Sequence, residues 1–253
     1  MDIFQDYAYY YQALYKDKDY RGEAVKIDGL LKHYSDTKIK TILNAGCGGG
    51  YHDTEFSRMG YRVTGVDQSF GMIETAAANA KKNGVSIKYL QGDIRSFNPQ
   101  EKYDAVISLF HVMSYQNTNQ DLLDAFSSCR SAVKEGAVFL FDAWYGPGVL
   151  RDIPAVRVKK AEAGNKSIIR IASPRMHDKD NLVDVSYEIL VIDNESRSVQ
   201  KIEEIHKMRY LFKPEIELIL NQSGFRLIDI LDCNTLGDTD YSSWTCYFIA
   251  KAE

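Results

Sequence analysis

The chain has 253 residues, of which 45% are hydrophobic and 26% are charged, and its formal net charge is −4. These values are ordinary for a soluble globular protein, and no apolar run approaches the roughly 18 residues that a membrane-spanning helix needs. The basic residues are scattered, whereas a nucleic-acid-binding protein needs a basic surface to neutralise phosphates. A small-molecule partner is therefore favoured.

The first residues, Met1 to Asp6, show neither the basic start nor the apolar stretch of a signal peptide. The cysteines have no spacing typical of a metal site, so we expect no metal and reduced thiols. The chain is expected to be a cytoplasmic protein that binds neither membranes nor nucleic acid. The sequence leaves the oligomeric state open, with a homodimer among the expected assemblies. The cysteines are Cys47, Cys129, Cys233 and Cys246.

Residues 1–37 are expected to form an N-terminal helical region, because apolar residues recur at helical spacing between Glu23 and Leu31. Tyr7, Tyr11 and Tyr15 would share one helical face. Such a face can act as a lid that excludes water and offers hydroxyls to a ligand. It can equally pack against a sheet, and both interpretations stay open.

Residues 38–154 alternate strands and helices in the manner of a Rossmann-like, doubly wound α/β sheet. The most informative feature is a glycine turn, Asn44–Gly50, which follows a first apolar strand. A second apolar run leads to Asp67. Glycines allow a ligand to approach the main chain, and an acid about 20 residues later is placed to accept from a ribose hydroxyl. The pattern indicates a cofactor that contains adenosine.

The spacing of the glycines decides between cofactors. A dinucleotide-binding turn needs a glycine where this chain has Tyr51, and a P-loop needs a lysine that this turn lacks. The glycines at positions 46, 48 and 50 form the pattern G-x-G-x-G instead.

Caps and apolar runs predict the other elements of this segment. Ser69 is expected to cap a helix from about Phe70 to Lys82, and Asn119 to cap a helix from Gln120 to about Lys134, closed by Gly136. Right-handed crossovers bring the loops after all the strands to one edge of the sheet, where such sheets bind ligands. The later strands are predicted to end at Gly92–Ile94, at Phe110 and at Asp142.

The pattern changes after residue 154. Residues 155–212 contain four β-rich runs, and one of them keeps a period of two from Val183 to Val191. We predict that they form an antiparallel sheet inserted on the substrate side. Residues 213–253 begin a helix with Pro214 in its first turn and end with two strands that complete the core sheet.

The G-x-G-x-G turn followed by an acid resembles the signature of class I S-adenosylmethionine-dependent methyltransferases. This resemblance implies S-adenosylmethionine as cofactor, S-adenosylhomocysteine as product, and a seven-stranded sheet whose last strand is antiparallel. The whole chain also resembles bacterial N-methyltransferases that act on nucleotide-linked amino sugars. The segments that carry this second resemblance are Tyr7–Tyr11, Lys18–Tyr20, Phe141–Tyr145 and Glu203–Phe212.

The resemblance and the loop positions give two sets of expected binding residues. Asn44 departs from the family, which usually has an acid there, yet an asparagine can still accept from the cofactor's ammonium. Asp142 could instead cap a backbone amide, and His206 could be an ordinary sheet residue. The cofactor-binding set is Asn44, Ala45, Gly46, Gly48, Gly50, Asp67, Gln68, Met72, Gly92, Asp93, Ile94, Leu109 and Tyr20. The substrate-binding set is Tyr7, Asp142, Trp144 and His206.

The general base cannot be carried over from the family directly. In the amino-sugar enzymes a histidine follows the fourth strand, whereas here Tyr115 falls at that position and His111 comes four residues earlier. We expect His111, Tyr115 and Tyr11 to be the catalytic residues. His111 is the first choice of base, because a histidine titrates near neutral pH. A loop histidine without a chemical role is the alternative.

The sequence thus predicts an S-adenosylmethionine-dependent methyltransferase that acts on a small molecule, in the first place a nucleotide-linked amino sugar. The methyl group of the cofactor is already activated, so the protein mainly aligns the reactants and excludes water. Two alternatives stay open: an O-methyltransferase of a sugar, glycan or small metabolite, and a catalytically silent cofactor-binding protein. Tyr51 disfavours a nicotinamide oxidoreductase.

Overall fold

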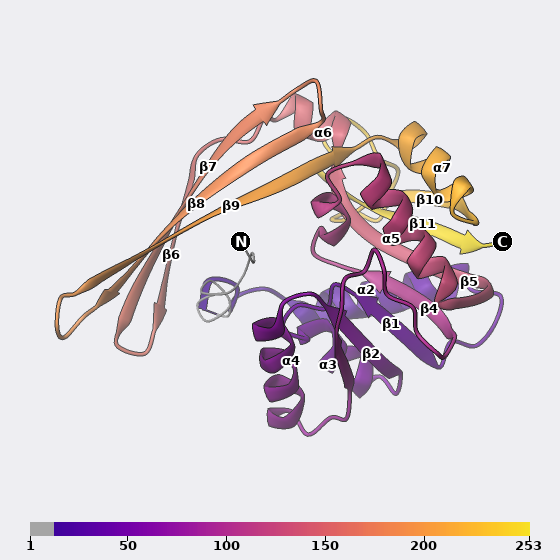
Figure 1. Ribbon diagram of the computed structural model, residues 1–253, viewed down its shortest axis with the longest axis horizontal. Helices are drawn as coiled ribbons and strands as arrows, with labels where there is room; N and C mark the ends of the chain where they lie inside the picture. The colour runs from indigo at the N-terminus through magenta and orange to yellow at the C-terminus, as the bar shows by residue number, and fades with distance from the viewer. Residues whose placement is uncertain (1–12) are drawn as a thin grey trace.

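A computed structural model describes residues 13–253 of the chain. Tyr7 and Tyr11 lie outside the described residues, so their predicted roles stay predictions. The described chain forms a Rossmann-like core from which four long strands extend as an arm (Figure 1). The predicted α/β class is confirmed.

The core sheet has the strand order β3-β2-β1-β4-β5-β11-β10. Strands β1 to β5 pair in parallel, whereas β11 pairs antiparallel with both β5 and β10. This confirms the predicted seven-stranded sheet with an antiparallel last strand. The strands are β1 (Thr41–Ala45), β2 (Arg62–Asp67), β3 (Lys88–Gln91), β4 (Tyr103–Ser108), β5 (Val133–Tyr145), β10 (Phe225–Asp232) and β11 (Thr245–Ala252).

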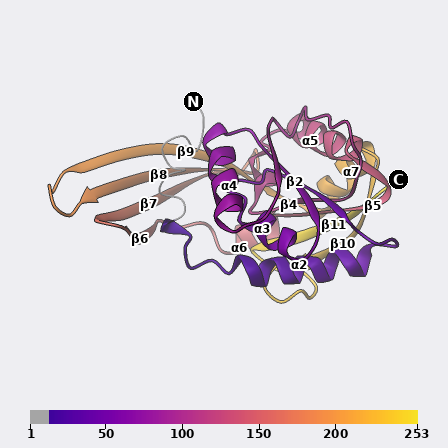
Figure 2. The ribbon, with the colours of Figure 1, turned by 90° about the horizontal axis from the view of Figure 1, so that it is seen from below.

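Helices cover both faces of the core sheet, because neighbouring residues of each strand bury their side chains on opposite faces. Helices α2 and α3 pack on one face through Ile27 and Phe56. Helices α5 and α7 pack on the other through Phe126 and Ile216, and Figure 2 shows the two pairs on opposite sides. The helices are α2 (Tyr20–Tyr34), α3 (Tyr51–Arg58), α4 (Phe70–Lys82), the 3-10 turn η1 (Val112–Tyr115), α5 (Asn119–Ser131), α6 (Gly146–Arg151) and α7 (Lys213–Gln222).

The arm is an antiparallel sheet in which each strand pairs with the next, as predicted for the insertion. Its last strand is continuous with the core, since Tyr210 and Leu211 pair in parallel with Trp144 and Tyr145 of β5. Leu14, near the start of the described chain, is buried against the arm. The arm strands are β6 (Arg157–Ala163), β7 (Lys166–His177), β8 (Leu182–Asp193) and β9 (Val199–Leu211).

Two boundaries around α5 were predicted wrongly. The N-cap is Thr118 rather than Asn119: its hydroxyl accepts from Asp121 N at 3.0 Å, and the Asp121 carboxylate accepts from Thr118 N at 3.1 Å. The helix ends at Ser131, and Gly136 lies inside β5 instead of closing the helix. The reason is that the branched side chain of Val133 is buried in the core, where a strand suits it better than a helix.

Gly148 of α6 packs directly against the backbone that precedes β11. A Cβ atom at this position would lie 2.0 Å from the carbonyl oxygen of Ser243, which cannot rotate away. We expect Gly148→Ala to lower the free energy of unfolding by about 1–3 kcal/mol through overpacking. In the matched control, Gly29→Ala, the new Cβ would meet nothing within 4 Å and should stabilise helix α2 by about 0.5–1 kcal/mol. Urea unfolding measures both, and equal stabilities would contradict the prediction.

Candidate active site

A cavity of about 810 Å³ lies at the carboxyl edge of the core strands, between the core and the arm. This volume suits a small-molecule ligand. Ala45, Gly50 and Asp142, which were predicted to bind ligands, do not line the cavity. The predicted residues that do line it are Tyr20, Asn44, Gly46, Gly48, Asp67, Gln68, Met72, Gly92, Asp93, Ile94, Leu109, His111, Tyr115, Trp144 and His206.

The turn between β1 and α3 requires its glycines. Gly46, Gly48 and Gly50 have φ angles of 83°, 52° and 70°, in the left-handed region that side chains disfavour. A Cβ at Gly46 would also lie 2.5 Å from Cγ1 of Val112. The turn therefore presents bare main chain to the cavity.

Asp67, at the end of β2, fixes the turn from the other side. Its Oδ2 accepts from Gly48 N and its Oδ1 from Ser69 N, both at 2.9 Å. Burial raises the pKa of Asp67, and these two hydrogen bonds oppose the rise. Because an ionised carboxylate has about four acceptor positions, Asp67 can still accept hydrogen bonds from a ligand.

Behind the turn lies a buried carboxylate that was not among the predicted residues, Asp53 of α3. Asn44 Nδ2 donates to Asp53 Oδ1 at 2.6 Å, and Asp53 is fully buried. A Cβ at Gly65, in the middle of β2, would lie 2.8 Å from Asp53 Oδ2 and 2.7 Å from the ring of Tyr89. A glycine inside a strand often marks such a close approach. Gly65 is therefore the sequence feature that could have indicated a buried group beside β2.

The buried carboxyl makes stability depend on pH. Burial raises the pKa of Asp53 to about 7, although the hydrogen bond from Asn44 and the nearby Tyr89 hydroxyl lower it. The folded state therefore keeps its proton after the unfolded chain has ionised, so this group lowers the free energy of unfolding as pH rises from about 4 to about 7.

We expect Asp53→Asn to stabilise the ligand-free protein by about 2–4 kcal/mol at pH 8 and by much less at pH 5. Chemical unfolding of both proteins at the two pH values measures this. A difference that is the same at pH 5 and pH 8 would contradict it.

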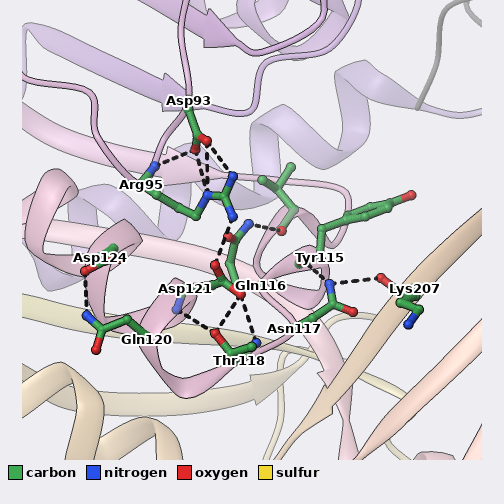
Figure 3. Close-up of polar contacts among 11 residues, drawn as sticks. Asp93, Arg95, Tyr115, Gln116, Asn117, Thr118, Gln120, Asp121, Asp124 and Lys207 are labelled. Carbon is green, nitrogen blue, oxygen red and sulfur yellow. Dashed lines mark hydrogen bonds and ion pairs between the residues drawn. The ribbon is translucent and has the colours of Figure 1, made fainter. Parts of the chain in front are cut away.

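Asp93, in the loop after β3, is held by an ion pair. Arg95 Nη2 lies 2.6 Å from Asp93 Oδ2, and Arg95 Nη1 reaches Asp121 Oδ1 of α5 at 2.9 Å (Figure 3). The hydrogen bonds from Arg95 lower the pKa of Asp93. The pairing ties the loop after β3 to the start of α5. Asp93 still lines the cavity as a carboxylate.

Phe110 and His111, directly after β4, both have left-handed backbones, with φ angles of 69° and 64°. Two such residues in succession are unfavourable without support, and they are typical of functional sites. Asp142 gives that support: its oxygens accept from His111 N at 3.1 and 3.2 Å, and its Oδ2 lies 2.8 Å from His111 Nδ1. Asp142 thus contacts the histidine rather than the cavity, and Nε2 is the ring nitrogen that does not lie beside this carboxylate.

A second group of polar side chains joins the core to the arm. The Tyr115 hydroxyl lies 2.7 Å from His206 Nδ1, and His206 Nε2 lies 2.9 Å from Glu204 Oε2. With Tyr115 as donor, His206 accepts at Nδ1 and donates from Nε2 to Glu204. His206 is therefore not an ordinary sheet residue: it is buried beneath a tyrosine of the cavity wall.

Further aromatic and basic side chains complete the wall; Tyr20 was among the predicted cofactor-binding residues, whereas Tyr51, Arg170 and Tyr187 were not predicted. On the core side, Tyr20 stacks on Tyr51 with ring centres 4.8 Å apart. On the arm, the Arg170 guanidinium lies 5.1 Å from the ring centre of Tyr187 and donates to the Tyr15 hydroxyl at 2.8 Å. Arg170 and Tyr187 reach the wall through contacts between residues distant in sequence, so their spacing gave no signal.

A family profile described as a methyltransferase domain matches residues 42–136. Residues 42–136 form a methyltransferase domain. The match begins in β1 and ends in β5, so it includes the glycine turn, Asp67 and Asp93. The predicted methyltransferase, with S-adenosylmethionine as its cofactor, is confirmed for this domain.

The chain is also similar to other proteins that are named as methyltransferases. A ubiquinone biosynthesis O-methyltransferase of Rickettsia canadensis is 40% identical over 98 residues, which are 39% of this chain and 42% of that protein. The chain thus spans less than half the length of this relative. A dTDP-3-amino-3,4,6-trideoxy-alpha-D-glucopyranose N,N-dimethyltransferase of Streptomyces venezuelae is 23% identical over 88% of this chain and 91% of its own. The crystal structure of an S-adenosylmethionine-dependent methyltransferase from Clostridium acetobutylicum covers 99% of both chains with a TM-score of 0.83 at 19% identity, which supports the fold.

Two further findings concern membrane-spanning helices and the state of the cysteines. None of the helices in residues 13–253 combines the length and the apolar character needed to cross a bilayer. All four cysteines are unpaired thiols.

Proposed function

We propose that the protein is an S-adenosylmethionine-dependent methyltransferase that methylates the amino group of a nucleotide-linked sugar. The observation that carries this proposal is the shared cavity. One wall holds the glycine turn and Asp67, and the facing loop holds His111 against Asp142. The cavity therefore brings a cofactor-binding edge and a candidate base together.

The residues of the turn fit this cofactor. The turn exposes main chain without Cβ atoms, Asp67 has unused acceptor positions, and the buried Asn44 Oδ1 has no hydrogen-bond partner in the described chain. The cofactor would supply a methyl group on a sulfonium centre. Asn44 and the turn would hold its methionine part, Asp67 its ribose, and the loop at Asp93 its adenine.

His111 would remove the proton that blocks attack. A sugar ammonium must lose a proton before its nitrogen can attack, and His111 Nε2 would accept it while Asp142 steadies the ring through Nδ1. The nitrogen would then take the methyl group and the positive charge, and the cofactor would leave as a neutral thioether. Tyr115, supported by His206, would orient the acceptor from the arm side.

The arm supports a phosphate-bearing sugar. Arg157, Arg170 and Lys207 line the cavity on the arm side, whereas the acids Asp67 and Asp93 line it on the core side. Basic groups suit the diphosphate of a nucleotide. The amino-sugar enzyme aligns with 88% of this chain, a span that must include part of the arm.

An O-methyltransferase is the second candidate, because the more identical relative carries that name. Its match covers 39% of the chain, about the size of the cofactor-binding domain.

Transfer of a labelled methyl group separates the two. The protein would be incubated with labelled S-adenosylmethionine and with pairs of nucleotide sugars that differ only in carrying an amine or a hydroxyl. Our proposal expects label on the amino sugars alone. Label on the hydroxyl series would support O-methylation, and no transfer despite cofactor binding would support a silent cofactor-binding protein. We further propose that the protein acts in the cytoplasm, which its unpaired thiols favour; the homodimer stays a prediction.

A further inference from the structure

We propose that Asp53 is a positioning residue for the cofactor: it orients the Asn44 amide and supplies negative charge to the cationic methionine part of S-adenosylmethionine. The inference deepens the proposed function and depends on it. No residue was predicted from the sequence to position the cofactor through another side chain. Asp53 does not line the cavity itself, so it would act through Asn44.

The orientation of Asn44 is the first step. Asn44 is 2% exposed and lines the cavity, and its Nδ2 donates to Asp53 Oδ1 at 2.6 Å. Its Oδ1 has no hydrogen-bond partner in the described chain. Buried carbonyl oxygens are nearly always satisfied, so this buried orphan acceptor, in a residue that lines the cavity, indicates a donor that arrives with the ligand. The ammonium of the cofactor is such a donor.

The charge of Asp53 is the second step. The titratable groups that face it are Tyr89 of β3, Asp67 of β2 and Cys47 of the turn, and none of the three is a cation. Its Oδ2 also lacks a hydrogen-bond partner in the described chain. A fully buried carboxylate normally has a partner of opposite charge. The missing cation is what an ammonium and a sulfonium in the cavity would provide.

The packing of the cluster is the third step. A Cβ at Gly65 would strike Asp53 Oδ2, and a Cβ at Gly50 would lie 2.3 Å from the Tyr89 hydroxyl. The absence of a side chain at Gly65 leaves room for the Asp53 carboxyl, and its absence at Gly50 leaves room for the Tyr89 hydroxyl. The glycine at position 50 therefore accommodates this cluster, although it does not line the cavity.

A coupling between protonation and binding follows. A cation in the cavity favours the ionised form of Asp53, so binding of the cofactor should release a proton where the free protein holds one. The affinity should therefore fall as pH drops from 8 to 6. The cofactor's own amino group also titrates near pH 8, but it does so equally in every variant. The difference between wild type and variant at each pH isolates Asp53.

The test is calorimetric titration of the full chain with S-adenosylmethionine and S-adenosylhomocysteine at pH 6, 7 and 8. We expect Asp53→Asn to bind both about 10-fold more weakly at pH 8, with the extra pH dependence lost. The double variant Asn44→Asp/Asp53→Asn exchanges carboxylate and amide, and it should bind within about threefold of wild type. The matched control is Asp180→Asn in an exposed turn, which should change nothing.

The possible outcomes distinguish a failure of the inference about Asp53 from a failure of the proposed function. Thermal unfolding shows that each variant is folded, and Asp53→Asn should be at least as stable as wild type at pH 8. Wild-type affinity and pH dependence in Asp53→Asn would overturn the inference, as would a folded double variant that binds no better than Asp53→Asn. A wild-type protein that binds neither compound at any pH would instead overturn the proposed function.

Discussion

Replacing His111 with alanine is expected to slow methyl transfer by about 10²–10⁴-fold, the usual contribution of a general base. The affinity for S-adenosylmethionine should change little, because the proposed role of His111 is to act on the acceptor rather than to hold the cofactor. Single-turnover transfer of labelled methyl measures the first quantity, and calorimetry measures the second. The prediction depends on the left-handed backbone at His111 and on the Asp142 carboxylate that holds it.

Two further variants sharpen this test. His33→Ala removes an exposed histidine of α2 and should leave the rate unchanged. Asp142→Asn keeps the size of the side chain but weakens its hold on His111, so we expect a fall in rate of about 10-fold with normal cofactor affinity. A rate for His111→Ala within a few-fold of wild type would rule out the base. Tyr115, backed by His206 and Glu204, would then be the residue to test.

Asp67→Ala should weaken cofactor binding by about 1–3 kcal/mol, or about 5- to 150-fold. Two losses combine in this variant: the expected acceptor of the ribose hydroxyls, and the partner of the Gly48 and Ser69 amides. Equilibrium titration with S-adenosylmethionine and S-adenosylhomocysteine measures the change. Both compounds carry the ribose, so both should lose affinity alike.

The matched control for this variant is Asp180→Ala, which removes the same carboxylate from an exposed turn of the arm. It should bind both compounds as wild type does. An unchanged affinity in a folded Asp67→Ala protein would show that the ribose is held elsewhere.

The sequence could predict those parts of the site that lie within short stretches of chain. The glycine turn and Asp67 belong to consecutive elements, so their spacing alone placed them on one wall. Ser69 was recognised as the cap of α4 for the same reason, and it does accept from Met72 N. The cofactor-binding side of the site could therefore be predicted from short sequence patterns.

The sequence could not predict contacts between residues that are close only in the fold. Asp142 was expected on the cavity wall, but the register of β4 beside β5 turns its carboxylate to His111. Arg170 and Tyr187 line the cavity from the arm, and neither is close in sequence to the loops of the core sheet. Asp53 was missed because its surroundings are formed by Gly65 of β2 and Tyr89 of β3, which are close to it only in the fold.

The pairing between β5 and β9 limits how this protein can be re-engineered. Strand β9 carries Glu204 and His206 along its length, and its final residues are bonded to the main chain of β5. A chimera made by exchanging residues 155–212 with a homologue would therefore cut through a hydrogen-bonded ladder. Swapping acceptor preference should succeed only when the graft includes both sides of that ladder, from Trp144 to Leu211.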